Sequence, residues 1–264
     1  IIKEGVNVYG AFPATGNPGM DDRKPLDETN VYQTILEPAT VAERQITDYI
    51  NYASDETGGL NGIHSEKTTI YIRRVLAQEN KYNPKRFEVS DTDTETKYYW
   101  RKGFDTPTEW DGFTIQKGRI DLRSTTDDGG AGARIYENVT LKNCIIQNNK
   151  STLTHINRYG SDDSGTHKPD GRGGGVYSLG GTLINCYIRN NELGAWDNNG
   201  IGSWKENGAM YGGGIFCNYS TLYNCIIADN VIHGNFADGA GVCLEVGEFF
   251  NNTVVRNKVE GGKD

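Results

Sequence analysis

The chain has 264 residues, a formal net charge of −8 and 34 glycines. The excess of acidic residues argues against nucleic acid and anionic membrane surfaces as partners. No apolar run approaches the roughly 20 residues that a spanning helix needs, so we expect no membrane insertion of this segment. Residue 1 is Ile rather than Met and no signal peptide is visible, which predicts a processed or trimmed chain.

The first 109 residues contain short predicted strands separated by long polar stretches. Strands are expected within Val6–Phe12, Gln33–Leu36 and Thr68–Leu76, and weak helical periodicity predicts a short helix over Thr40–Ala53. These are interpreted as early turns of a repeating structure, interrupted by insertions. Part of this region is expected to cover the end of the core, because an exposed terminal strand invites aggregation.

A ten-residue sequence recurs from residue 110 onward. A degenerate copy, WDGFTIQKG, occupies Trp110–Gly118, and it is expected to form a fourth strand over Trp110–Gln116. Four full copies begin at residues 140, 182, 221 and 248, and they read TLKNCIIQNN, TLINCYIRNN, TLYNCIIADN and EFFNNTVVRN. A block of small residues (AGA, GGG, GGG or GAG) ends ten residues before the first Asn of each full copy. Such repetition predicts a solenoid, in which each repeat packs on its neighbours.

Alternation within each copy predicts an inward and an outward strand face. The second, fifth and seventh positions are almost all apolar, and we expect them to point inward. The fifth and seventh positions are Phe113 and Ile115, Cys144 and Ile146, Cys186 and Ile188, Cys225 and Ile227, and Asn252 and Val254. The second position is Leu141 in the first full copy and Phe249 in the last. The sixth position, Ile145 in the first full copy, is expected to face outward.

Asparagines bracket each predicted strand. Those before it are Asn143, Asn185, Asn224 and Asn251, and those after it are Asn149, Asn191, Asn230 and Asn257; Gly112 and Gly118 replace them in the degenerate copy. Asn and Gly both tolerate left-handed backbone angles, so both sets are predicted to be bends. Stacked copies would place Asn above Asn in a ladder, and the glycine blocks would line a narrow corner. The pattern predicts a parallel β-helix with coils roughly 4.8 Å apart.

The combination of GGG[VI], NCxIxxNN, WDGFTI and an N-terminal NVYGAF resembles bacterial right-handed parallel β-helix surface proteins. It is similar to the repeats of polymorphic outer-membrane proteins and autotransporter adhesins, with Cys mostly in place of Phe and Gly in place of Ala. This resemblance implies an all-β, single-stranded right-handed parallel β-helix of the pectate-lyase-like superfamily. We expect one domain over residues 1–264, irregular over 1–109 and regular over 110–264, that continues into a further domain or anchor.

The connections after each final Asn vary in length and span residues 119–130, 150–172, 192–211 and 231–238. All insertion thus falls at one corner, which is often the binding face of a solenoid. Loops on neighbouring coils are expected to touch, which makes their polar and aromatic residues the candidate ligand-binding set. These candidates are His155, Tyr159, His167, Lys168, Asp170, Arg172, Trp196, Asp197, Trp204 and His233.

Two interpretations of these loops remain open. Aromatic rings can stack on sugar faces while carboxylates and Arg bind hydroxyls, which favours a polysaccharide or host-surface glycan as ligand. Alternatively, Trp196 and Trp204 merely pack long loops onto the sheet. Cleavage of a glycosidic bond would require two carboxylates across that bond. The available carboxylates are Asp162, Asp163, Asp170, Asp197 and Glu206, whereas Lys168 and Arg172 could neutralise charge in a lyase.

No cofactor or metal is predicted. Calcium is a weak alternative at Asp91, Asp93 and Glu95, which lack the Gly and bidentate Glu of an EF-hand. The cysteines are expected to be buried apolar residues, with disulfides left open. They are Cys144, Cys186, Cys217, Cys225 and Cys243. The leading functional hypothesis is a non-catalytic, adhesin-like or glycan-binding protein, extracellular or on the outer cell surface. A polysaccharide lyase or glycoside hydrolase and a structural stalk are the alternatives.

Overall fold

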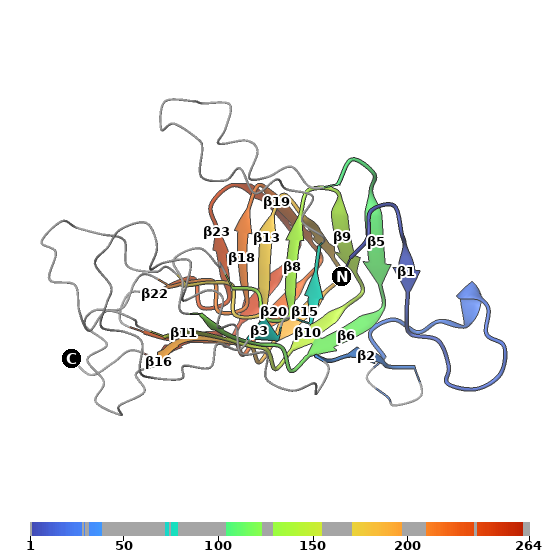
Figure 1. Cartoon of the computed structure of the whole chain (residues 1–264), viewed down its shortest axis with the longest axis horizontal. Helices are drawn as coiled ribbons and strands as arrows, with labels where there is room; N and C mark the ends of the chain where they lie inside the picture. Colours follow the sequence, from blue (N-terminus) through green and yellow to red (C-terminus); the bar gives the residue numbers. More distant parts are fainter. Residues whose placement is uncertain are drawn as a thin grey trace, which may run out of the picture.

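The computed structural model of the chain describes residues 2–27, 29, 32–38, 72–73, 75–78, 104–122, 129–154, 171–196, 210–234 and 237–260. The described residues form an all-β structure of five sheets, with one short 3-10 helix, η1 (Met20–Asp22) (Figure 1). The helix predicted over Thr40–Ala53 lies outside the described residues.

The chain passes through the five sheets, named S1 to S5, in this order, although the described turns that contain β1 to β8 contribute no strand to S4. S1 contains β1 (Val8–Tyr9), β5 (Thr108–Asp111), β9 (Val139–Lys142), β14 (Thr182–Ile184), β19 (Ser220–Tyr223) and β24 (Gly247–Phe250). S2 contains β2 (Thr34–Leu36), β6 (Phe113–Gln116), β10 (Ile145–Gln147), β15 (Tyr187–Arg189), β20 (Ile226–Ala228) and β25 (Thr253–Val255).

S3 contains β3 (Ile72–Arg73), β7 (Arg119–Leu122), β11 (Lys150–Thr154), β16 (Glu192–Trp196), β21 (Val231–His233) and β26 (Lys258–Glu260). S4 contains β12 (Gly171–Arg172), β17 (Met210–Tyr211) and β22 (Ala237–Asp238). S5 contains β4 (Leu76–Ala77), β8 (Ala133–Tyr136), β13 (Val176–Leu179), β18 (Ile215–Asn218) and β23 (Val242–Leu244).

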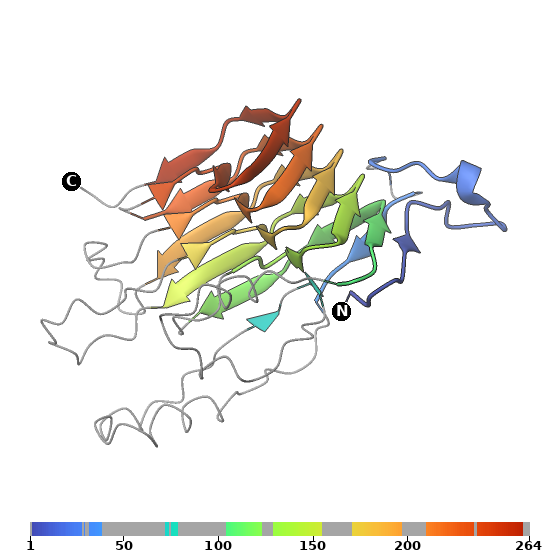
Figure 2. The same ribbon diagram turned by 90° about the horizontal axis from the view of Figure 1, so that it is seen from above.

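Successive copies of the repeat stack in register, as the sequence predicts. Ile146 pairs with Ile188, which pairs with Ile227, and the same order holds in the other sheets (Figure 2). Pairing is parallel throughout, except between β3 and β7, which are antiparallel. The parallel sheets are consistent with the predicted parallel β-helix.

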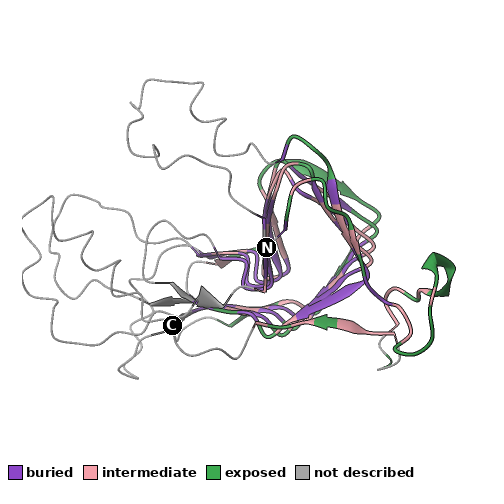
Figure 3. Ribbon diagram, turned by 45° about the vertical axis from the view of Figure 1, so that its right-hand side comes forward, coloured by how far each residue is buried: buried purple, intermediate pink, exposed green. Residues whose placement is uncertain are grey.

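The predicted inward positions form the main core, between S1, S2 and S5 (Figure 3). Ile115, Ile146, Cys186 and Ile188 are completely buried there. A second core lies between S3 and S4, where Ile120, Leu193, Met210 and Ile232 meet. S3 and S4 therefore form a two-sheet arm on the main body. The strands of S3 and S4 lie within the connections that the sequence predicted as loops. The variable connections therefore begin three to five residues later than predicted, and those that lead into S4 end two residues earlier.

The Asn set that follows each strand separates the two cores. Asn191 is fully buried, and its side chain accepts hydrogen bonds from the backbone and side-chain N–H groups of Asn149, at 3.1 and 3.0 Å. Asn230 and Asn257 continue this ladder in the same way. Small residues are required opposite it, because a Cβ added to Gly175 would lie 2.7 Å from the Asn191 side chain. The predicted ladder and narrow glycine corner are thus confirmed.

The bend prediction is right for one Asn set and wrong for the other. The preceding set has left-handed φ angles of 50°, 53°, 59° and 52° at Asn143, Asn185, Asn224 and Asn251. In the following set, the left-handed residue is instead the one before the ladder Asn. These residues are Lys117, Asn148, Asn190, Asp229 and Arg256. The ladder Asn residues do not adopt positive φ angles, and their side chains point inward and donate to backbone oxygens of the preceding coil.

Two residues depart from the predicted faces because of their surroundings. Ile145 is on the outward face but only 2% exposed, since the N-terminal segment covers it. Phe249 is on the inward face yet 37% exposed, because β24 has a strand on only one side. Gly112 also divides the predicted fourth strand into β5 and β6, with a φ of 86°.

Candidate functional site

Most residues of the predicted loop site lie outside the described residues. These are His155, Tyr159, His167, Lys168, Asp170, Asp197 and Trp204. Trp196 is the last residue of β16 and pairs in register with Thr154. Arg172 and His233 are the two candidates whose side-chain surroundings are described.

Arg172 lies at the base of the loops, in the corner between S4 and S5. Its guanidinium lies over the rings of Phe216, at 5.0 Å, and Tyr211, at 5.9 Å. The Phe216 ring stacks on Tyr177 at 5.4 Å, and Arg134 lies over Tyr177. Tyr177 and Phe216 are buried, so these rings position the two guanidinium groups and present no face to a ligand.

His233 lies on the other side of the arm. Its Nδ1 is 3.3 Å from the Glu260 carboxylate on the neighbouring strand β26. Ile232, which precedes His233, meets Met210 in the second core. Met210 is the register partner of Gly171, which precedes Arg172. Because side chains alternate along strands, His233 and Arg172 point away from that core on opposite faces. The structure therefore does not bring these two predicted site residues together.

The N-terminal segment is held against the bend between S1 and S2 by a buried ion pair. The guanidinium of Arg23 is 3.0 Å from the Asp111 carboxylate, with the two side chains only 8% and 6% exposed. Arg23 also donates to the backbone oxygens of Gly10 and Asp111. The same Asp111 oxygen, Oδ1, also accepts from Asn143 at 2.8 Å, and Arg23 donates to the other oxygen at 3.2 Å. This polar cluster positions residues 23–27 and 32–36 over the first coils.

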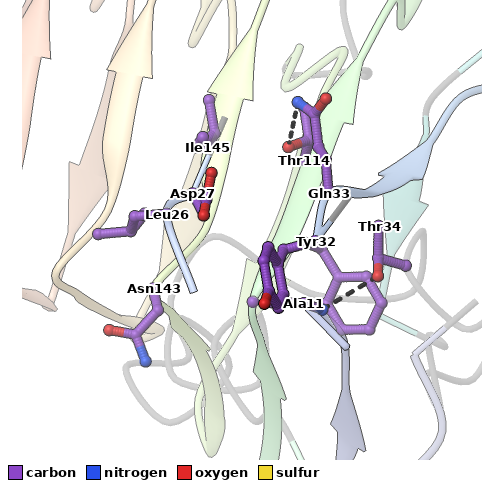
Figure 4. A pocket seen from close by; sticks show the side chains of 11 residues that line it. Ala11, Leu26, Asp27, Tyr32, Gln33, Thr34, Thr114, Asn143 and Ile145 are labelled. Atoms are coloured by element: carbon purple, nitrogen blue, oxygen red, sulfur yellow. Dashed lines mark hydrogen bonds between the residues drawn. The ribbon is translucent and has the colours of Figure 1, made fainter. Parts of the chain in front are cut away.

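A hollow lies where this segment meets the body (Figure 4). Leu26, Asp27 and Tyr32 line one side of it, and Asn143 and Ile145 the other. Gln33 donates to the Thr114 hydroxyl at 2.9 Å and fixes the segment to β6. The hollow is small and encloses about 10 Å³, which is room for about one water molecule. It cannot enclose a sugar ring, so a ligand here would lie on the surface, with at most one hydroxyl group directed into the hollow.

An exposed aromatic and aliphatic surface begins beside the hollow. We call Tyr187, Tyr223, Ile226 and Phe250 the aromatic surface. Tyr187 pairs in register with Ile145, which lines the hollow, and with Ile226 on the next coil. Tyr223 pairs with Phe250 in S1. Tyr223, Ile226 and Phe250 are 48%, 38% and 54% exposed. Exposed apolar clusters of this kind commonly mark binding surfaces.

The same outward row changes from covered to exposed along the stack. Thr114 and Ile145 are each 2% exposed beneath the N-terminal segment, whereas Ile226 in the same row is open. Sequence reasoning missed this surface because it assigned binding to the variable loops. The alternating pattern does contain the signal, since aromatic or aliphatic residues stand at outward positions in three consecutive copies.

Asp27 supplies a carboxylate at the hollow. Hydrogen bonds from the backbone and side chain of Thr29 lower the pKa of Asp27 below its ordinary value. Asp27 is therefore ionised at neutral pH and accepts hydrogen bonds only. Hydroxyl groups of a ligand are suitable donors for it.

The thiols of Cys186 and Cys217, in the main core, stay protonated. All five cysteines are free, and burial raises the pKa of the Cys186 and Cys217 thiols well above the usual range. Burial also raises the pKa of the half-exposed Cys243 thiol, to which the Glu245 and Asp238 carboxylates contribute. A thiol that stays protonated is a poor nucleophile.

Within the described ranges, no three His, Cys, Asp or Glu side chains gather in a way that could hold a metal ion. Asp91, Asp93 and Glu95 lie outside those ranges. No helix in the described part of the chain is long and apolar enough to cross a membrane. Comparisons of the chain with protein-family models, curated proteins and solved structures find no match.

Proposed function

We propose that this chain is a single right-handed parallel β-helix of a secreted or cell-surface protein, of the adhesin type that its repeats resemble. We propose further that its aromatic surface binds glycan without catalysis. The observation that carries this proposal is the pair Tyr223 and Phe250, which lie side by side in register with about half of each ring exposed. An exposed ring offers an apolar face to the C–H groups of a sugar.

The geometry suggests how a saccharide would lie. Neighbouring strands are roughly 4.8 Å apart, so rings on successive coils present repeated contacts along the stack. The hollow at Leu26, Asp27 and Tyr32 stands at one end of this row. There, the Asp27 carboxylate would accept a hydroxyl hydrogen while Tyr187 contacts the sugar ring. Apolar contacts with a few polar acceptors are typical of ligand sites.

The alternative function is a polysaccharide lyase or glycoside hydrolase acting in a groove lined by the loops. Its candidate acids, Asp162, Asp163, Asp170, Asp197 and Glu206, lie outside the described residues. Arg172 at the base of these loops is the described residue that favours a charged substrate there, since a guanidinium pairs well with carboxylates. A structural stalk remains the third hypothesis.

A glycan array followed by a reducing-end assay on every hit distinguishes these functions. The proposal predicts saturable binding without new reducing ends. Cleavage of a bound glycan would contradict the non-catalytic proposal and support the lyase or hydrolase alternative. The complete absence of glycan binding would refute it and leave a protein partner or a stalk.

A further inference from the structure

The four strands β23 to β26 form an open edge, which we define by these strands. Each is the last strand of its sheet and has a neighbour on one side only. The inward side chains Phe249, Val254 and Val259 are 37%, 48% and 50% exposed. Their counterparts one coil earlier are fully buried, and they are Leu222, Ile227 and Ile232. The open edge therefore presents core-type side chains together with unpaired backbone groups.

The Asn ladder gives this edge a direction. At each internal step, the backbone N–H of one ladder Asn donates to the side-chain oxygen of the next: Asn149 to Asn191, Asn191 to Asn230, and Asn230 to Asn257. Asn257 directs its own side chain back, donating to the Ile227 oxygen at 2.9 Å. Within the described residues, no ladder Asn follows Asn257. Its backbone N–H lacks the acceptor that every earlier step supplies.

The polar residue among the inward positions does not close the edge. Asn252 stands where the earlier copies have Cys, but its side chain bonds the coil below. Its oxygen accepts from the Cys225 backbone at 2.7 Å, and its nitrogen donates to the Leu222 oxygen. Asn252 therefore completes the interface with the preceding coil.

We propose that the open edge binds a further β-coil with the pattern of the repeat itself. That partner segment has a block of small residues and, ten residues later, Asn-x-apolar-x-apolar followed by Asn. The Asn supplies the missing ladder oxygen, and the small residues leave room for that Asn within the same coil, as Gly241 does for Asn257, which lies 2.6 Å from a Cβ added to Gly241. Addition of strands to an exposed sheet edge is a recurrent mode of recognition.

The direction of the ladder argues against a second copy of this chain as the occupant. Two open edges facing each other would present two Asn257 N–H donors and no acceptor. Gly118, the first residue of the described ladder, donates to the Asn149 oxygen at 2.9 Å and has no side-chain oxygen of its own. Gly118 is also buried, and the strand β6 before it is paired with β2, so this ladder position is not open to a second copy. A new coil with its own Asn satisfies the donor, so it is the occupant that the hydrogen-bond pattern favours.

A labelled peptide with the sequence of residues 210–234, with Cys217 and Cys225 replaced by Ala, tests the proposal by fluorescence anisotropy. Val254→Lys places a charge on the inward face of the edge, and Val255→Lys places one on the outward face of the same strand. Both side chains are already exposed, at 48% and 37%, so both variants should fold. Far-UV circular dichroism and the molar mass in solution are measured in parallel.

We expect saturable peptide binding to the wild-type chain, reduced at least about tenfold by Val254→Lys and little changed by Val255→Lys. A peptide with Asn230→Leu, which lacks the ladder oxygen, should bind at least about tenfold more weakly. Equal loss in both protein variants, or no binding by a monomeric chain, would overturn the proposal. Self-association that Val254→Lys abolishes, without peptide binding, would overturn it in favour of a second copy.

Discussion

Replacing Asn191 with Ala tests the role of the buried ladder. The Asn191 side chain accepts from the backbone and side-chain N–H groups of Asn149 and donates to the oxygens of Ile146 and Asn230. The variant leaves the Asn149 backbone N–H and the Ile146 oxygen without these partners in a dry interior. An orphaned buried polar group costs about 1–3 kcal/mol, so two of them predict a loss of about 2–6 kcal/mol.

The neighbouring Asn190→Ala provides the matched control. Asn190 is exposed and left-handed, with a φ of 52°, and its side chain takes no part in the ladder. Its replacement should cost about 1–2 kcal/mol, from backbone strain alone. Urea unfolding followed by circular dichroism at 25 °C measures both variants. If Asn191→Ala loses no more stability than Asn190→Ala, the ladder is not the structural element that we infer.

Three further predictions concern the N-terminal segment, the thiols and the pH dependence of binding. Arg23→Ala leaves the Asp111 carboxylate buried without its cation, and it should destabilise the N-terminal segment by about 3–5 kcal/mol. Limited proteolysis should then cut faster within residues 10–27, and an unchanged cleavage rate would contradict this prediction. In the native chain at pH 8, Ellman's reagent should leave Cys186 unmodified and react slowly with Cys243. All five cysteines should react in urea. Rapid labelling of Cys186 in the native chain would show that the core is open to the reagent. Because the pKa of Asp27 is lowered, its carboxylate stays ionised as the pH falls. Glycan binding should therefore remain constant from pH 8 to about 4 and weaken below pH 4. A loss of binding near pH 6 would show that a group other than Asp27 controls it.

The repeat in the amino-acid sequence is enough to predict much of the fold. Alternation places Ile146 and Cys186 inside. The recurring Asn positions predict a ladder, because Asn stands at the same place in every full copy and stacked copies bring these places together. The exact bend positions are not predictable in this way. Asn149 and Asn148 are equally suited to a left-handed angle, and the choice between them depends on which side chain reaches the neighbouring coil. Similarly, the cover over Ile145 depends on residues 26–27 and 32–34, more than a hundred positions away.

The candidate site is less accessible to sequence reasoning than the fold. The length of the variable connections predicts a binding site in residues 150–172 and 192–211. Tyr223 and Phe250 belong to regular strands, and their sequence pattern predicts only that their side chains point outward. What distinguishes them is exposure, which depends on where the N-terminal segment ends over the body. Arg172 is the opposite case. Its place in a variable connection suggests a ligand contact, whereas in the structure its guanidinium lies over the buried Phe216 ring.

Isothermal titration of the strongest glycan-array hit tests the central claim most directly, using the wild-type chain, the double variant Tyr223→Ala/Phe250→Ala and the control Met20→Ala. Met20 is as exposed as Phe250, at 54%, but lies in η1, outside the aromatic surface. Loss of two stacking contacts worth about 0.5–1.5 kcal/mol each predicts roughly 5- to 150-fold weaker binding by the double variant. Met20→Ala should bind like the wild type. Equal affinity of all three proteins would contradict glycan binding at the aromatic surface.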